Sequence, residues 1–401
     1  MKLSPFPVTA ILLAMLATGP LRAETQAASG TTAASTTNLL SAQATLGIGL
    51  LQGLAAADGS RRTIVVSPGS VASALAFLEL GADPTMGRAI AKTLGFASEG
   101  GSDAMQALRN SAKELAAAPA GQGPLAFGNG IFVDPAGEVD ATKLRDAGVF
   151  VESASLGEPA GIAKVNAWVS TQTGGLIPTI LSDPIPNAAL VALNALHFKD
   201  KWLSPFDKRL TSTQPFHLVG GKTSDVAMMR ASAEVSLRQD DHFIAAALPY
   251  VTDGYSLVVV TTKADPATIA DFAPAADWLT GKDFDSGKVE LSLPKFTAEA
   301  TNRLLPHLDK LGLADGHSPT AFNRLSAKPL DISDVVQKTQ IKVDEEGTEA
   351  AAATAVTVTR ALVTDVTPMV VDKPFIFALR DDKHGLILLA GYVGDPNPSN
   401  P

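Results

Sequence analysis

Six histidines and the adjacent carboxylates Glu345-Glu346 and Asp381-Asp382 are among the side chains of this chain suited to metal or acid–base chemistry. A zinc site on one helix needs two histidines at ligand spacing, as in HExxH, and no pair here has it. Glu345-Glu346 and Asp381-Asp382 are neighbours on the chain, a pattern more typical of solvated turn charges than of an acid/base dyad. We therefore expect no metal and no cofactor. The histidines are His197, His217, His242, His307, His317 and His384.

Nucleophilic chemistry has no clear signature either. The chain has no cysteine, which excludes a thiol nucleophile and cysteine-ligated metals. It has no GxSxG elbow, no GxxxxGK[ST] loop and no complete GxGxxG. A GNG at 128–130 precedes a strand-like run and is interpreted as a turn or a backbone contact. A Ser/His/Asp triad assembled from distant positions stays open, so a hydrolase is a rival hypothesis, but we expect no enzyme.

The stretch 344–363, DEEGTEAAAATAVTVTRALV, has no reactive group of note, but its pattern indicates a backbone that can change conformation. In an extended strand, alternate residues face opposite sides. The even side carries small or β-branched residues without charge or proline, and Gly347 in front of it opens backbone conformations closed to other residues. This pattern predicts a segment able to slip between existing strands, or else an ordinary Ala/Thr-rich loop or edge strand. The even-numbered residues are Thr348, Ala350, Ala352, Thr354, Val356 and Val358.

Composition limits the partners. Of 401 residues, 46% are hydrophobic and 18% charged, enough for a sizeable core. The net charge is −9 and no basic stripe occurs, so nucleic acid is not expected as a partner. Lys2, the apolar run 8–17 and a small residue before Glu24 predict a signal peptide over residues 1–23, too short to anchor in a membrane. We expect export, with a disordered linker at 24–37.

The elements that would position this segment form one mixed domain. Helical spacing begins at Asn38, and Pro68 stands where a helix favours proline, in its first turn. Further helices are predicted near 85–95, 103–117, 161–171, 266–281 and 301–313, a buried strand at 63–67, and strands after about 190. Helices gather early and strands late, which indicates an α+β fold, with a single domain over 38–397.

Several blocks of the sequence resemble the serpin family, in the order in which that family has them. They include TIVVSPGSVASALAFLELGA (63–82), NALHFKDKWLSPFD (194–207), ISDVVQKTQIKVDEEGTEAAAATAV (332–356) and LLAGYVGDP (388–396). The resemblance implies a serpin fold of about nine helices and three β-sheets, with an exposed reactive-centre loop at about 345–368. It also implies a monomeric trapping inhibitor of serine endopeptidases. A protease cleaves the loop, forms an acyl-enzyme, and is held when the loop inserts as a strand into the central sheet.

The resemblance also implies residue roles. A shutter would control opening of the sheet, and insertion would begin at a breach beside Trp202. In the family, a histidine often stands where this chain has Gln337. The loop hinge would be Glu345, Glu346, Gly347, Thr348, Glu349, Ala350, Ala351, Ala352 and Ala353. The shutter residues would be Ser67, Ser70, Asn194 and Gln337.

The family's loop length leaves two cleavage sites open. One lies between Ala361 and Leu362 and suits an elastase- or subtilisin-like protease. The other, between Arg360 and Ala361, suits a trypsin-like protease. The small hinge favours an inhibitor over the alternative, a non-inhibitory serpin-fold binding or chaperone protein. With the signal peptide, the expected location is secreted or periplasmic, without membrane or nucleic-acid partners.

Overall fold

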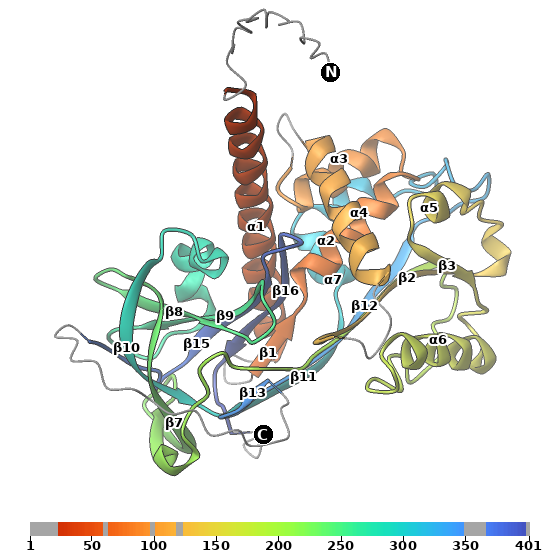
Figure 1. The fold of residues 1–401 in the computed structure, drawn as a ribbon. Coiled ribbons are helices and arrows are strands. Elements are labelled where there is room, and N and C mark those ends of the chain that lie inside the picture. The colour runs from red at the N-terminus through yellow and green to blue at the C-terminus, as the bar shows by residue number, and fades with distance from the viewer. Residues whose placement is uncertain (1–22, 59–62, 97–100, 118–122, 349–365, 398–401) are drawn as a thin grey trace, which may run out of the picture.

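The computed structural model describes residues 23–58, 63–96, 101–117, 123–348 and 366–397, with side chains from Asn38 onwards (Figure 1). These parts contain seven α-helices and four 3-10 helices. The α-helices are α1 (Ala23–Asp58), α2 (Pro68–Glu79), α3 (Pro84–Thr93), α4 (Gly101–Ala117), α5 (Thr142–Asp146), α6 (Pro159–Gln172) and α7 (Leu305–Lys310). The 3-10 helices are η1 (Pro135–Gly137), η2 (Lys208–Leu210), η3 (Ile269–Thr280) and η4 (Leu313–Gly316).

A seven-stranded sheet runs through the middle of the fold in the order β3-β2-β4-β12-β13-β5, with β11 paired to β12. Its two central strands, β4 and β12, are parallel to each other. The strands are β2 (Leu125–Val133), β3 (Phe150–Ser153), β4 (Leu190–Phe198), β5 (Asp200–Lys201), β11 (Phe296–Arg303), β12 (Ile332–Val343) and β13 (Gly347–Thr348).

The remaining strands form one nine-stranded network, in the order β1-β16-β15-β9-β8-β7-β10-β14 with β6 on β7. The expected second and third sheets join here because the 17-residue β7 pairs with β8 at one end and with β10 and β6 along the rest. The strands are β1 (Thr63–Val66), β6 (Ser212–His217), β7 (Thr223–Gln239), β8 (Phe243–Pro249), β9 (Tyr255–Thr262), β10 (Asp285–Pro294), β14 (Thr367–Val370), β15 (Phe375–Asp381) and β16 (Leu386–Val393).

Local sequence explains where these elements begin. The Asp83 carboxylate accepts hydrogen bonds from the backbone N–H groups of Thr85 and Met86, and Pro84 takes the first turn of α3. Strand β4 is buried at all nine positions, so its sequence LVALNALHF is apolar almost throughout rather than alternating. The strand therefore lies at the centre of the sheet, covered on both faces.

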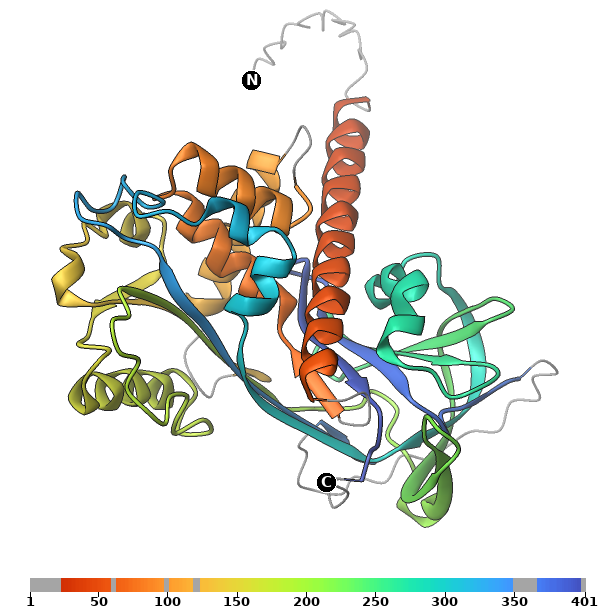
Figure 2. The same ribbon diagram turned by 180° about the vertical axis from the view of Figure 1, so that it is seen from behind.

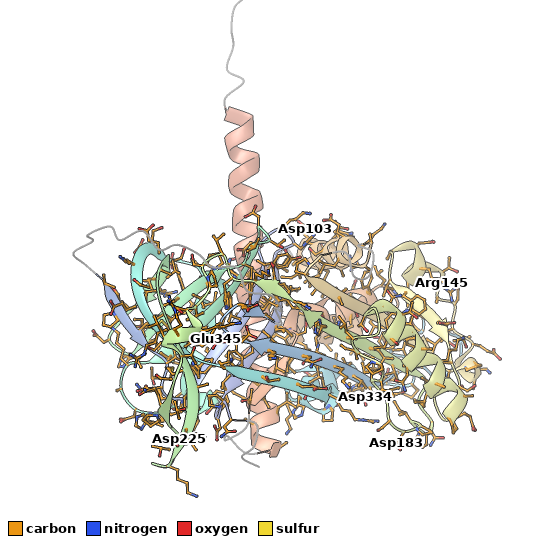
Figure 3. The ribbon with its side chains drawn as sticks, turned by 60° about the horizontal axis from the view of Figure 1, so that its bottom comes forward. Asp103, Arg145, Asp183, Asp225, Asp334 and Glu345 are labelled. Atoms are coloured by element: carbon orange, nitrogen blue, oxygen red, sulfur yellow. The ribbon has the colours of Figure 1, made fainter. Side chains whose placement is uncertain are left out.

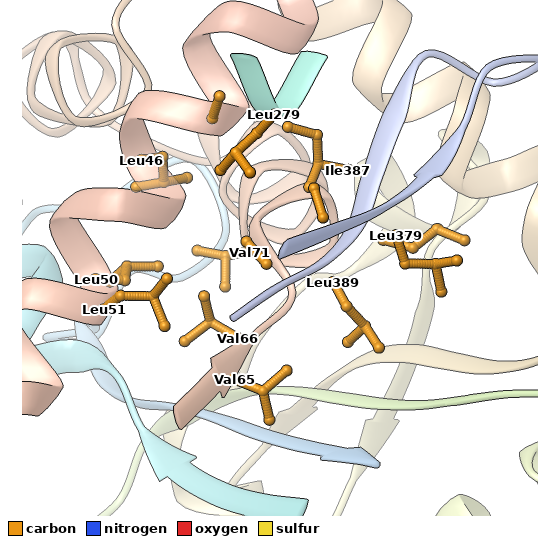
Figure 4. Packing of buried hydrophobic residues seen from close by; sticks show 14 of the residues in the cluster. Leu46, Leu50, Leu51, Val65, Val66, Val71, Leu279, Leu379, Ile387 and Leu389 are labelled. Atoms are coloured by element: carbon orange, nitrogen blue, oxygen red, sulfur yellow. The ribbon is translucent and has the colours of Figure 1, made fainter. Parts of the chain in front are cut away.

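The core joins the two ends of the chain. α1 packs on β16 and η3, and β1 pairs antiparallel with β16 from Thr63↔Val393 onwards. Leu50, Leu51 and Val66 are fully buried between them (Figure 4). Residues 38–57 have the length and composition to cross a membrane. The burial of their leucines in this core identifies them as a core helix.

The segment 24–37, expected as a disordered linker, is drawn as helical backbone in the structure. Residues from Ala23 belong to α1, whose N-terminal part extends beyond the other elements (Figures 1 and 2). Once the buried part of α1 has formed, adding residues to its end avoids the cost of nucleation. The segment 24–37 has four alanines and no proline; Gly30 and the threonines are weak helix formers, but none of them blocks propagation as a proline would. Residues 1–22 of the expected signal peptide lie outside the described residues.

Candidate functional site

The two central strands of the seven-stranded sheet are closed against each other. β4 and β12 pair in parallel from Ile332↔Leu190 to Gln340↔His197, with one irregularity between Ile332 and Asp334. Hydrogen bonds between these strands would have to break before another strand could enter. The expected shutter residues Asn194 and Gln337 stand on these two strands, directly opposite each other.

One row of buried amide side chains crosses four neighbouring strands at the middle of this sheet. In the strand register, Asn194 of β4 lies opposite Asn129 of β2 on one side and Gln337 of β12 on the other. On the far side of β12, Asn302 of β11 lies opposite Gln337. Asn194 donates to the Gly128 carbonyl at 3.2 Å, but its Oδ1 has no hydrogen-bond partner among the described residues. Asn194 Oδ1 is thus a buried acceptor in this row without a hydrogen-bond partner among the described residues.

These amides bind the corner where β1 turns into α2. Gln337 accepts from the Ser67 N–H at 2.6 Å and donates to the Ser67 carbonyl at 3.1 Å. The hydroxyls of Ser67 and Ser70 are 2.6 Å apart, and Asn129 donates to the Ser70 carbonyl at 3.3 Å. Asn302 completes the corner by donating to the Val65 carbonyl at 2.8 Å. The four expected shutter residues are therefore brought together, with Gln337 carrying two backbone bonds.

At the end of β12 the chain turns back into the same sheet. β13 pairs antiparallel with β12 at Val343↔Thr348 and with β5 at Gly347↔Lys201 and Thr348↔Asp200. The first residues of the segment singled out by sequence thus already lie between two strands. The rest of that segment, 349–363, with hinge residues Glu349 to Ala353 and both candidate cleavage sites, Arg360 to Leu362, lies outside the described residues.

Position 347 requires glycine because the backbone of β5 lies too close for a side chain. A Cβ built on it would lie 2.1 Å from the Asp200 carbonyl oxygen and 2.7 Å from the Lys201 Cα, both of them backbone atoms. Since neither neighbour can move without displacing β5, only glycine fits here while β13 is seated.

Thr348 is fully buried, and its hydroxyl lies 2.7 Å from the Tyr250 hydroxyl. The Tyr250 ring stacks on the Trp202 indole, with centroids 4.5 Å apart and planes at 20°. The indole N–H donates to the Asp344 carbonyl at 2.9 Å, and the Trp202 backbone N–H donates to the Glu346 carbonyl at 3.0 Å. Burial raises the pKa of Tyr250 far above its ordinary value, so the phenol stays neutral. Trp202 therefore lies beside residues 344–348, at the start of the expected hinge.

The two glutamates are anchored rather than solvated, so the expectation of turn charges is wrong for both. Glu345 accepts from Lys295 at 2.8 Å and from the Thr211 hydroxyl at 2.8 Å, and Glu346 pairs with Lys208. Burial acts to raise the pKa of Glu345, but the hydrogen bonds from Lys295, the backbone and Thr211 outweigh it and lower the pKa.

The second acidic pair differs from expectation at Asp381 alone, since Asp382 is an exposed turn residue. Asp381 is buried and accepts from the His384 backbone N–H at 3.0 Å, with the His384 Nδ1 2.6 Å from its carboxylate. Among the described residues no group of three or more histidines or carboxylates is placed to hold a metal. The GNG at 128–130 lies inside β2, where a Cβ on Gly130 would come 2.7 Å from the Trp168 ring. It is a backbone contact, and the turn interpretation is wrong.

Sequence reasoning missed several residues of the site. Partners 50 or more residues away along the chain give Tyr250, Lys295, Asn129 and Asn302 their roles. The asparagine in an otherwise apolar β2 is the one signal that could have been followed, since a buried amide needs a partner.

Known proteins share this architecture. Residues 41–396 match the family model described as serpin, a serine protease inhibitor. The chain is 28% identical to human glia-derived nexin, covering 83% of this chain and 87% of that protein. It is 30% identical to Serpin-Z7 of Hordeum vulgare, covering 86% and 92%. Among solved structures, Tengpin, a thermophilic serpin in its native state, superposes with a TM-score of 0.75 at 24% identity, covering 89% of this chain and 94% of Tengpin.

Proposed function

Because the chain belongs to the serpin family, whose members are typically protease inhibitors rather than catalysts, we propose that it is a trapping inhibitor of serine endopeptidases. The observation that carries this proposal is β13. Two residues of the hinge already occupy the position of a new antiparallel strand, at the end where β12 and β5 stand apart.

The register of β13 can be extended along both neighbouring strands. Starting from Val343↔Thr348 and Asp200↔Thr348, six more residues bring Thr354 opposite Gln337 on one side and Asn194 on the other. These two residues are now paired with each other. A strand continued from β13 therefore fits between β4 and β12 in a single register, and supports insertion along the whole length of the sheet.

The side chains suit that path. On the inward face, Ala350 and Ala352 are small enough to enter without displacing the buried residues around β4. Thr354 would arrive at the amide row, where its hydroxyl could donate to the open Asn194 Oδ1. On the outward face, Glu349 would fall opposite Lys342 and Lys199, and a carboxylate between two cations is favourable there.

In the proposed reaction the serine of the target protease attacks the carbonyl carbon of Ala361, forming an ester and releasing Leu362 as a new amino terminus. Attack at Arg360, releasing Ala361, is the second possibility. Cleavage frees the segment from its distal attachment, so it can continue β13 between β4 and β12 and carry the ester-linked protease with it. The closed sheet before cleavage is then a state held by a barrier.

The proposed partner is an elastase- or subtilisin-like protease if Ala361 enters the specificity pocket, and a trypsin-like protease if Arg360 does. With the expected signal peptide, the inhibitor would act as a secreted or periplasmic monomer. No cofactor has a part in the proposed reaction.

Mixing the protein with elastase, subtilisin and trypsin in turn tests the proposal. We expect a complex with at least one enzyme that survives boiling in SDS, and sequencing of the released peptide should begin at Leu362 or Ala361. The same protease with its active-site serine replaced by alanine is the control and should give no such complex. If every enzyme clips the loop and stays fully active, trapping of these proteases is refuted, and a non-inhibitory binding protein becomes the better hypothesis.

A further inference from the structure

His317 is held between two carboxylates that come from different parts of the chain. Its Nδ1 lies 2.9 Å from both carboxylate oxygens of Asp331, and its Nε2 lies 2.8 Å from Oδ1 of Asp309. Asp309 belongs to α7, His317 directly follows η4, and Asp331 directly precedes β12. The imidazole therefore joins both ends of the segment 317–331 to α7.

This geometry fits the protonated imidazole. A neutral imidazole has an N–H group on one ring nitrogen and a lone pair on the other, whereas the imidazolium has two N–H groups. With a carboxylate at each nitrogen, a neutral His317 would turn its lone pair towards one of two anions. Burial acts to lower the pKa of His317, but the hydrogen bonds with Asp331 and Asp309 outweigh it and raise the pKa above 6.5. Gain or loss of one proton thus changes how many contacts the ring can make.

Asp331 connects this ring to the central sheet. Its Oδ1 also accepts from the backbone N–H of Ile332 at 2.8 Å, and Ile332 is the first residue of β12. Ile332 lies opposite Leu190 of β4, where the pairing of the two central strands begins. This end of β12 is the one far from the hinge, as the positions of Asp334 and Glu345 show (Figure 3).

We propose that Asp309, His317 and Asp331 form a proton-dependent clamp on the start of β12. The clamp is closed when the imidazole is protonated, because each carboxylate then accepts a hydrogen bond from an N–H group. When the proton is lost, one carboxylate faces a lone pair and that contact opens. Since the folded-state pKa of His317 is raised above 6.5, the stabilisation from the clamp is complete below pH 6.5 and is lost as pH rises through the folded pKa. Mildly acidic surroundings therefore hold this end of the sheet more firmly than alkaline ones.

The elements around the clamp carry other charged groups, and histidine is the only type among them that ordinarily changes charge between about pH 5 and 8. The second histidine of α7, His307, faces α1, since a Cβ built on Gly53 would lie 2.6 Å from its Nδ1. Lys92 of α3 pairs with Asp315 of η4 at 2.7 Å. Among these neighbours His307 is therefore the group to separate from His317 by experiment. The remaining charged residues on 38–58 of α1, on α3, α7 and β12 and in the segment 317–331 are Asp58, Arg88, Lys310, Arg324, Lys328, Asp334, Lys338 and Lys342.

NMR titration of the histidine ring signals in the intact protein tests the charge state. Substituting the other five histidines by glutamine one at a time, His307→Gln included, identifies the His317 signal by elimination. We expect its pKa above 6.5 in the wild type, and lower by about one unit in Asp309→Asn and in Asp331→Asn, because each variant removes an opposite charge in contact. Asp315→Asn removes a nearby carboxylate that pairs with Lys92 instead, and is the matched control with a much smaller shift. A wild-type pKa at or below 6.5, or a shift in Asp315→Asn as large as in the other two variants, overturns the proposal.

Denaturant unfolding at a series of pH values tests the effect on stability. The wild type should unfold at a higher denaturant concentration than His317→Gln at pH 6, and this gap should narrow as pH rises through the folded pKa of His317. The gap for Asp315→Asn should not narrow, because no histidine takes part in its ion pair. A gap for His317→Gln that stays constant with pH overturns the clamp.

Amide hydrogen exchange at pH 6 tests the hold on β12. The N–H of Ile332 should exchange severalfold faster in Asp309→Asn than in the wild type, although its own acceptor Asp331 is unchanged. Equal exchange overturns the connection between the clamp and the strand. The two asparagine variants keep the size of the side chain, so the NMR test stays decisive even if His317→Gln fails to fold. None of these readouts uses a protease, so this proposal and protease trapping can fail separately.

Discussion

Replacing Thr348 with arginine tests whether seating of the hinge drives inhibition. Thr348 is fully buried and bonded to Tyr250, so an arginine there would bury a charge without a partner. The effective penalty for such a charge is several kcal/mol, whereas each backbone hydrogen bond of the two-residue β13 contributes about 0.5–1.5 kcal/mol. The penalty exceeds what holds β13, and the hinge should leave the sheet.

Without a seated hinge, the acyl-enzyme has time to hydrolyse. We expect Thr348→Arg to shift the partition between trapped and released protease more than tenfold towards release, since about 1.4 kcal/mol suffices for a factor of ten. The assay is the number of inhibitor molecules consumed per protease inactivated, with SDS-stable complex measured in parallel. The milder Thr348→Val removes only the bond to Tyr250 and should destabilise the protein by about 1–3 kcal/mol.

Glu349→Gln is the control, because residue 349 is on the outward face of the same alternation and should tolerate an uncharged amide. Trapping by Thr348→Arg at the wild-type ratio would falsify the view that this residue must enter the sheet.

Three further changes test other parts of the site. Gly347→Ala should expel the hinge in the same way, because its Cβ would lie 2.1 Å from the Asp200 carbonyl oxygen. We expect more inhibitor molecules to be consumed per protease inactivated, and a wild-type ratio would contradict the close approach. Because the folded-state pKa of Glu345 is lowered from 4.5, its stabilising contribution is complete above pH 4.5 and is lost as pH falls through the folded pKa. Denaturant unfolding of the wild type and Glu345→Gln should converge in acid, and a constant difference would refute this. Gln337→Leu leaves the Ser67 N–H without a partner, while the Ser67 carbonyl keeps its bond from the Val71 N–H, so we expect a loss of about 1–3 kcal/mol in unfolding free energy. An unchanged melting temperature would show that the corner relaxes.

Sequence alone predicted the large elements because their signals are local. Pro68 at the start of α2 and the apolar run in β4 follow from helix geometry and burial. The alternation from Thr348 predicted a strand-forming segment; Thr348 lies in β13, and the rest of the segment, outside the described residues, stays a prediction. The helical state of 24–37 was not predicted, because it depends on the helix that follows it.

Partners distant in sequence could not be predicted in the same way. The burial of Glu345 follows from Lys295, 50 residues earlier, and the role of Gln337 follows from Ser67, 270 residues earlier. No spacing rule connects such pairs, since the topology of the sheet brings them together. The family resemblance supplied Ser67 and Gln337 but not Asn302, whose place in the amide row appears only from the register of β11 on β12.

The pairing of β1 with β16 sets the order in which this chain can fold. Thr63 meets Val393, so the first strand has no partner until almost the whole chain has been synthesised. Contacts between such distant residues are slow to form, because the intervening chain must be ordered first. Until they form, Val65, Val66 and the buried face of α1 lack part of their cover. The last strand to be made therefore closes the core, and truncation before Leu386 should prevent folding rather than merely weaken it.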